Sequence, residues 1–221
     1  MQESRATLGR MQNPIRGFLH GSAALAAAVG TIVLVSRAPS WSSRIAVTVF
    51  GLGMIALYTT SSLYHSIPWR EVWKERMQRA DHSMIFVLIA ASYTPIAALA
   101  LDGWLRWMTL VVVWGVTAVG VSHLAFFHNQ RYHLSIALMT TLGWLAVFIV
   151  WPVTQRAGVA ALLFILAGGI VYTIGMVFLV TNRPRLWPRV FSYHEVFHIL
   201  VITGTTLHFV ATYRYFVPLA S

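Results

Sequence analysis

The chain has 221 residues, of which 57% are apolar and only 10% are charged, whereas an ordinary soluble domain is about 45–50% apolar and about 25% charged. This composition argues against a water-soluble globule. The net charge of +10 does not indicate a nucleic-acid partner, because the basic residues punctuate long neutral runs instead of gathering in one patch. The absence of cysteine excludes disulfides, thiolate metal sites and cysteine nucleophiles.

Charge-free intervals divide the chain into seven stretches of membrane-spanning length. A helix that rises about 1.5 Å per residue needs about 20 apolar residues to cross a hydrocarbon core about 30 Å thick. The sequence therefore predicts an all-α integral membrane protein, in which residues 1–221 form a single bundle of seven transmembrane helices. The expected helices cover residues 17–36, 44–65, 82–101, 105–125, 133–151, 158–181 and 192–216.

The distribution of basic residues predicts the orientation of this bundle. With seven spans, the N-terminal tail and every second connection share one side, which carries eleven Lys and Arg residues against five on the other side. Basic loops are retained in the cytoplasm, so we expect a cytoplasmic N-terminus and a C-terminus on the opposite side. The basic tail resembles the start of a secretory signal peptide, but the apolar run after it is longer than a signal core. We therefore expect this run to be retained as the first helix.

Four ligand-type side chains converge at the cytoplasmic ends of three predicted helices. His65 ends the second helix, Asp81 opens the third, and His194 and His198 open the seventh. The last two are one helical turn apart, so their imidazoles can reach one metal ion. With His65 they predict a tri-histidine site. Zn²⁺ fits it best, because three imidazoles leave a fourth tetrahedral position open for water.

Two further polar residues are expected beside the metal. Asp81 is placed to hydrogen-bond a metal-bound water, whose pKa such a site lowers. Ser61 lies one turn before His65 on the same face of its helix. We therefore assign Asp81 and Ser61 as candidate catalytic residues.

The remaining histidines are expected to have other roles. His208 would lie about 21 Å from His194 along the seventh helix, too far to bind the same ion. We expect it to hydrogen-bond within the bundle, with a second polar station along a pathway as the alternative. Packing or interfacial positions are expected for His20, His82, His123, His128 and His133.

The segment His194-Glu195-Val196-Phe197-His198 also spells the H-E-x-x-H signature of zinc proteases, in which Glu is the general base. Leu101-Asp102-Gly103 resembles a motif of intramembrane site-2 proteases, but it precedes H-E-x-x-H and is predicted at the opposite membrane face. No acidic residue follows Glu195, and Gly204 stands where a metzincin has its third histidine. An intramembrane metalloprotease is therefore a lesser alternative. The other interpretation of Glu195 is an interfacial carboxylate near Arg189.

Two cofactor classes are tested by the same residues. A retinal protein needs a lysine within a helix for its Schiff base, and the only lysine, Lys74, is predicted in a loop, so rhodopsin-type function is excluded. His194 and His198 cannot ligate opposite sides of one haem iron because they share a helix face. Haem held by His65 and His194 stays open.

Three motifs, in this order along the chain, resemble the haemolysin III branch of the progestin and adipoQ receptor family. They are Ser61-x-x-x-His65, Asp81 followed by His82-Ser83-Met84, and His194-x-x-x-His198. The resemblance spans nearly the whole chain. It implies seven helices with a cytoplasmic N-terminus and a zinc ion near the cytoplasmic face, as in the adiponectin receptors. It also implies that the three histidines hold zinc, with Asp81 and Ser61 beside it.

The resemblance further implies a function. Alkaline ceramidases look related to this family and hydrolyse a lipid amide, which implies a zinc-dependent hydrolase of the bacterial inner membrane acting on an amide or ester of a membrane lipid. The alternative is a non-catalytic membrane sensor or homeostasis protein with a structural zinc, in which Asp81 would be the fourth ligand. A cytolytic, pore-forming haemolysin fits less well, because a pore needs a polar lining rather than one compact cluster.

Overall fold

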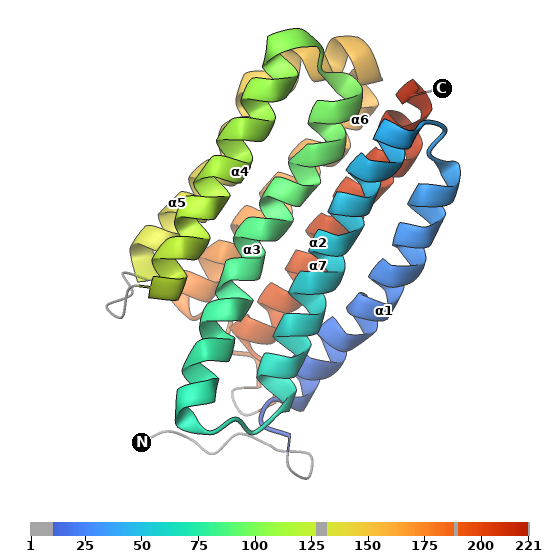
Figure 1. Cartoon of the computed structure of the whole chain (residues 1–221). Coiled ribbons are helices and arrows are strands. Elements are labelled where there is room, and N and C mark those ends of the chain that lie inside the picture. Colours follow the sequence, from blue (N-terminus) through green and yellow to red (C-terminus); the bar gives the residue numbers. More distant parts are fainter. Residues whose placement is uncertain (1–10, 127–131, 188–189, 221) are drawn as a thin grey trace.

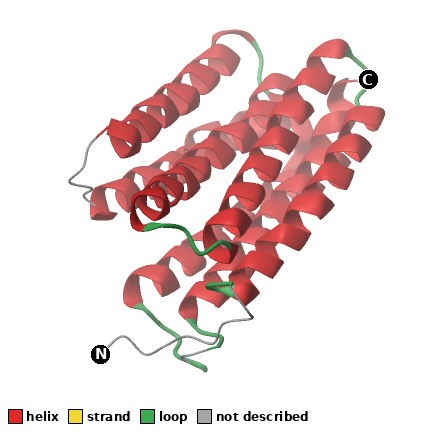
Figure 2. Cartoon of the chain, turned by 60° about the horizontal axis from the view of Figure 1, so that its bottom comes forward, coloured by secondary structure: helices red, strands yellow, loops and turns green. Residues whose placement is uncertain are grey.

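The computed structural model describes residues 11–126, 132–187 and 190–220. Over these residues the chain is helical and contains no strand (Figure 1). Figure 2 shows the helices joined by short loops. The helices are α1 (Pro14–Arg37), α2 (Trp41–Ser66), α3 (Glu71–Ala100), α4 (Gly103–Phe126), α5 (Tyr132–Trp144), α6 (Val150–Thr181) and α7 (Tyr193–Ala211). A 3₁₀ turn (Leu145–Ile149) joins α5 to α6, and a π turn (Thr212–Phe216) and a 3₁₀ turn (Val217–Ala220) continue α7.

Among the described residues, six helical segments are long and apolar enough to cross a membrane. Large apolar side chains lie on their outer surfaces, where Leu25, Val111 and Phe148 are each more than two-thirds exposed. Water would not favour so much exposed apolar area, whereas lipid tails would. The prediction of an all-helical, multi-pass membrane protein is therefore confirmed.

One of the six segments, Leu134–Thr181, is 48 residues long and folds back on itself. The reversal occurs at Gly158, whose φ of 82° is a conformation that residues with a Cβ rarely adopt. The indole of Trp144 donates a hydrogen bond of 3.2 Å to the hydroxyl of Thr173, so residues on the two sides of Gly158 lie side by side. This pairing describes a helical hairpin within a single continuous apolar segment.

An ion pair places the tip of this hairpin. Asp102, between α3 and α4, contacts Arg156 at 2.7 Å. The Gly158 turn therefore lies at the end of the bundle that carries the α3–α4 connection and the C-terminal end, at the top of Figure 1. The beginnings of α1, α3 and α7 lie at the other end.

Helix α3 begins at Glu71, not at residue 82 as predicted. The predicted boundary was wrong because charged residues were taken to end the helix as well as the membrane span. Lys, Glu and Arg are good helix formers in water. The helix therefore continues for about three turns beyond its apolar part, through a segment with the charged residues Glu71, Lys74, Glu75, Arg76 and Arg79.

Helices α2 and α3 are the most buried of the candidate spans. Phe86 on α3 and Phe50 on α2 have no exposed surface, and each belongs to one of the two clusters that form the apolar core. α2 packs between α1 and α3, and α7 packs against α6 and α1. Polar groups on the inner faces of α2, α3 and α7 are therefore held inside the bundle.

Candidate metal centre

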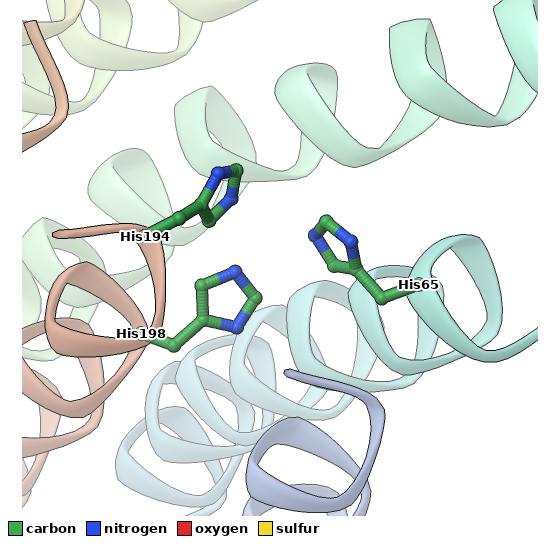
Figure 3. Close-up of side chains that lie close together, drawn as sticks. All are labelled: His65, His194 and His198. Carbon is green, nitrogen blue, oxygen red and sulfur yellow. The ribbon is translucent and has the colours of Figure 1, made fainter. Parts of the chain in front are cut away.

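Three histidines from two helices face one another where α2 ends and α7 begins (Figure 3). His65 lies in the last turn of α2, and His194 and His198 lie in the first two turns of α7. Their ring centroids are 4.9 to 5.3 Å apart. One ligand atom from each ring lies within 4.8 Å of the other two. The structure thus brings together the three histidines that the sequence analysis selected.

This donor set suits a metal ion. Tetrahedral Zn–N bonds of about 2.0–2.1 Å hold ligand nitrogens about 3.3 Å apart, so modest ring movements would bring the three donors onto one ion. His65 and His198 are buried, and Nδ1 of His198 makes no hydrogen bond to any described residue. A buried nitrogen without a partner is unfavourable, and coordination to a cation would satisfy it.

Asp81 and Ser61 lie beside the histidines. Both are buried, and the Ser61 side chain lies close enough to the Asp81 carboxyl to interact with it. A carboxylate only accepts, so the serine hydroxyl would be the donor of a hydrogen bond between them. Asp81 opens the apolar part of α3, and Ser61 lies one turn before His65 on α2. The two residues thus place a carboxylate, with a hydroxyl beside it, at the edge of the histidine cluster.

A cavity of about 580 Å³ extends from this cluster into the bundle. Ser61, Asp81, His194 and His198 line one part of it, and His208 lines another. Most of the remaining wall is apolar and comes from α3, α5, α6 and α7, with residues that include Ile85, Leu88, Ile96, Met139, Ile165, Met176 and Val201. The volume is typical of a small-molecule site. Its chemistry suits an amphiphile with an apolar tail.

Glu195 holds the start of α7 in place. Its Oε2 accepts a hydrogen bond of 2.8 Å from the backbone N–H of Ser192, which completes a capping box. Its Oε1 accepts a hydrogen bond of 2.6 Å from Nε of Arg16 on α1, and both side chains are less than a tenth exposed. Glu195 is therefore buried and ion-paired, not interfacial, and Arg189 lies outside the described residues. Both of its carboxylate oxygens are engaged in holding α7, which argues against the H-E-x-x-H interpretation.

His20 is a neighbour of the site for which the sequence predicted only a packing or interfacial position. It does pack, and its partner is a candidate ligand: its ring stacks on that of His198 with the centroids 4.0 Å apart. It also lines the cavity but lies outside the group of three ligands. The sequence does not show how α1 pairs with α2, so it could not predict that His20 lies beside His198. The Ser62 hydroxyl donates to the carbonyl of Gly17, a register that carries His20 to the depth of the site.

The other histidines are not part of the cluster. His208 donates from Nε2 to the carbonyl of Ile165 at 3.2 Å, the hydrogen bond within the bundle that was expected. His82 lines the cavity, and His123 is half-buried on α4. His128 lies outside the described residues, and the side chain of His133 is not described.

The sequence is similar to known proteins along most of its length. A sequence model of the family described as Haemolysin-III related matches residues 9–209. The chain is similar to Hemolysin-3 of Bacillus cereus, with 31% identity over 205 residues that cover 91% of this chain and 90% of that protein. It is also 31% identical to the hemolysin-3 homolog of Bacillus subtilis (strain 168) over 193 residues, covering 86% and 87% of the two chains.

A more distant similarity extends to mammals. The chain is 23% identical over 206 residues to the human monocyte to macrophage differentiation factor, covering 90% of this chain and 82% of that protein. The matched range, residues 9–209, contains the positions of all three histidines, Asp81 and Ser61. The chain therefore belongs to the haemolysin-III related family.

Proposed function

We propose that this protein is a zinc-dependent hydrolase that cleaves an amide or ester bond of a membrane lipid. The observation that carries the proposal is the convergence of three histidines beside Asp81 and Ser61 at the polar part of a largely apolar cavity. Catalytic zinc sites keep one position open, whereas structural sites are closed by four protein ligands. Asp81 is not among the ligand atoms that lie within 4.8 Å of one another, which favours a catalytic over a structural metal.

The residues of the chain have distinct roles in this reaction. Zinc held by His65, His194 and His198 would polarise the lipid carbonyl and acidify a water molecule. Asp81 accepts the proton of the attacking water and delivers it to the departing amine or alkoxide. Ser61 would orient the Asp81 carboxyl by donating a hydrogen bond to it. The apolar walls bind the acyl chain and exclude bulk water from the site.

Hydrolysis is tested with Asp81→Asn. The amide retains the shape of the side chain but cannot accept the proton, so we expect turnover to fall by a factor of about 10²–10⁴ while metal content is unchanged. The measurement is fatty acid released from a reconstituted lipid extract, followed by mass spectrometry, beside elemental analysis of the same protein.

The matched control is Asp102→Asn, the same chemical change at an exposed carboxylate at the other end of the bundle. We expect this variant to retain turnover. Loss of metal from Asp81→Asn would instead identify Asp81 as a ligand and favour the structural-zinc sensor. Unchanged turnover with retained metal would contradict its role as the base.

We further propose that the chain crosses the inner membrane of a bacterium seven times. A 48-residue helical segment measures about 72 Å, more than twice the hydrocarbon thickness, and the Asp102–Arg156 ion pair supports its return at Gly158. Two crossings by this segment would give seven spans, and we propose that the N-terminal end and the histidine cluster lie on the cytoplasmic side. The excess of basic residues at that end supports the same orientation.

A single introduced cysteine tests both the number of spans and the orientation, because the natural chain has none. Gln155 and Lys74 are exposed and lie near opposite ends of the bundle. We expect an impermeant maleimide to label Gln155→Cys in intact spheroplasts, and Lys74→Cys only after permeabilisation. Labelling of Lys74→Cys before permeabilisation would reverse the orientation. If both Gln155→Cys and Lys74→Cys stay unlabelled until permeabilisation, the double crossing is contradicted.

A further inference from the structure

A second polar group lies deeper in the bundle than the metal centre. It consists of Tyr172 on α6 with Thr205 and His208 on α7, and we call these three residues the inner polar station. Tyr172 and His208 line the same cavity as the histidine cluster. At 1.5 Å per residue, Thr205 and His208 lie about 10 and about 15 Å from His198 along α7. The proposed hydrolysis makes no use of these residues.

The hydrogen bonds of the station determine which atoms can donate. The Thr205 hydroxyl donates its one hydrogen to the carbonyl of Val201 at 2.8 Å. Its 2.7 Å hydrogen bond with the Tyr172 hydroxyl must therefore be donated by the tyrosine. The donors of both hydroxyls are thus used within the protein. The Tyr172 oxygen keeps lone pairs that can accept.

The same reasoning applies to His208. Its Nε2 is 3.2 Å from the carbonyl of Ile165, and a carbonyl only accepts, so Nε2 carries the hydrogen. In the neutral ring Nδ1 is then an acceptor. This Nδ1 is buried and has no hydrogen-bond partner among the described residues. The three residues of the station therefore keep acceptors on two residues that line the cavity, Tyr172 and His208, and have no donor left.

Gly168 gives the His208 ring its space. A Cβ at this position would collide with the His208 ring, so α6 and α7 approach closely only because the residue is glycine. The ring also contacts the Tyr172 ring edge to face, with centroids 5.5 Å apart. Packing from both sides thus fixes the histidine in its position at the cavity wall.

We propose that the inner polar station binds a hydroxyl group carried on the acyl chain of the lipid in the cavity. A group bound there must donate a hydrogen bond. An amide would also bring a carbonyl for which the station has no donor, and an ammonium would bring a charge among apolar walls. A keto or ester oxygen cannot donate. A hydroxyl on an otherwise apolar chain meets these conditions, so this lipid is a hydroxylated one. The inference rests on the proposed function only in that a lipid occupies the cavity.

Binding of fatty acids to the full-length protein in detergent tests the inference without catalysis. The probes are 12-hydroxystearic, 12-ketostearic and stearic acids, with 2-hydroxystearic acid as the control for hydroxyl position. Affinities come from displacement of a fluorescent fatty acid. We expect 12-hydroxystearic acid to bind about tenfold more tightly than the other three, which is the effect of one additional buried hydrogen bond.

Two variants assign this preference to the station. His208→Phe keeps an aromatic ring beside Gly168 but removes the acceptor, and should abolish the preference. Ser92→Ala removes a hydroxyl that also lines the cavity but donates to the carbonyl of Ile89 on its own helix, and should retain it. Equal binding of all four acids by the natural protein would overturn the inference, as would an undiminished preference in His208→Phe. A water molecule alone at the station would give equal binding.

The same measurements on metal-free and zinc-loaded protein separate this inference from the proposed function. A preference for 12-hydroxystearic acid in zinc-loaded protein that hydrolyses no lipid would support the station and contradict the hydrolase. Lipid hydrolysis without a preference for 12-hydroxystearic acid would support the hydrolase and contradict the station.

Discussion

The double variant His194→Ala, His198→Ala is expected to lose its metal, whereas the natural protein should carry about one zinc ion per chain. The substitution removes two of the three donors and leaves a single imidazole on α2. One imidazole cannot retain the ion against buffer, so metal content should fall to background and lipid hydrolysis should be lost with it. Elemental analysis of protein purified without chelators measures the first effect directly.

The control for this variant is His123→Ala, which removes a half-buried histidine of α4 from outside the cluster. We expect it to keep a full complement of metal. If the double variant and the natural protein contain the same amount of zinc, the ion is bound elsewhere and the proposed centre is wrong. If the natural protein carries one ion of another metal per chain, the three histidines remain the site, but the proposed zinc chemistry is wrong.

Substitution of Glu195 is expected to have the largest effect on stability. Glu195→Ala removes the negative charge that pairs with the buried Arg16 and the side chain that caps the start of α7. Breaking a buried ion pair from one side costs about 3–5 kcal/mol, which for a chain of this size lowers Tm by about 6–20 °C. Thermal unfolding of the purified protein in detergent measures the change.

Three further variants separate a structural role of Glu195 from a catalytic one. Arg16→Met combined with Glu195→Met removes both charges and should recover most of the lost stability. Asp102→Asn breaks an exposed pair and should change the free energy of unfolding by no more than about 1 kcal/mol. Glu195→Gln is the decisive case. Unchanged Tm with complete loss of hydrolysis would restore the H-E-x-x-H interpretation, in which this residue is the base.

The sequence alone was sufficient to select the three histidines. Ionisable groups are unfavourable in hydrocarbon, so the few that occur near the helices stand out. The alternation of helix direction then brings His65 and His194 to one end of the bundle. This reasoning needs only the lengths of apolar runs and the 3.6-residue period, both of which are local properties of the chain.

The neighbours of the site could not be predicted in this way. Arg16 was counted as a charge outside the first helix, yet it lies within α1 and is buried against Glu195. A packing or interfacial position was predicted for His20, although the residue on which it stacks is His198. Both results depend on α1 packing beside α2 and α7. A helix surrounded by lipid and other helices is apolar on every side, so its sequence does not indicate which face meets which neighbour.

The predicted start of α3 was wrong for a related reason. Charge marks where a segment leaves the hydrocarbon, and it was also used to mark where the helix ends. The two coincide at the start of α7, where the capping box of Ser192 and Glu195 ends the loop. They differ at α3, because nothing between Glu71 and Asp81 disfavours a helix in water.

The position of the metal ligands along the chain also bears on biosynthesis. His65 lies in the last turn of α2, whereas His194 and His198 lie in the first turns of α7, 129 and 133 residues later along the chain. Helices α3 to α6 are therefore synthesised before the three donors exist in one polypeptide, and α7 must still insert beside α1 and α2 for them to meet. Metal acquisition by the proposed centre would thus follow the synthesis of α7, and a chain truncated before α7 could not assemble it.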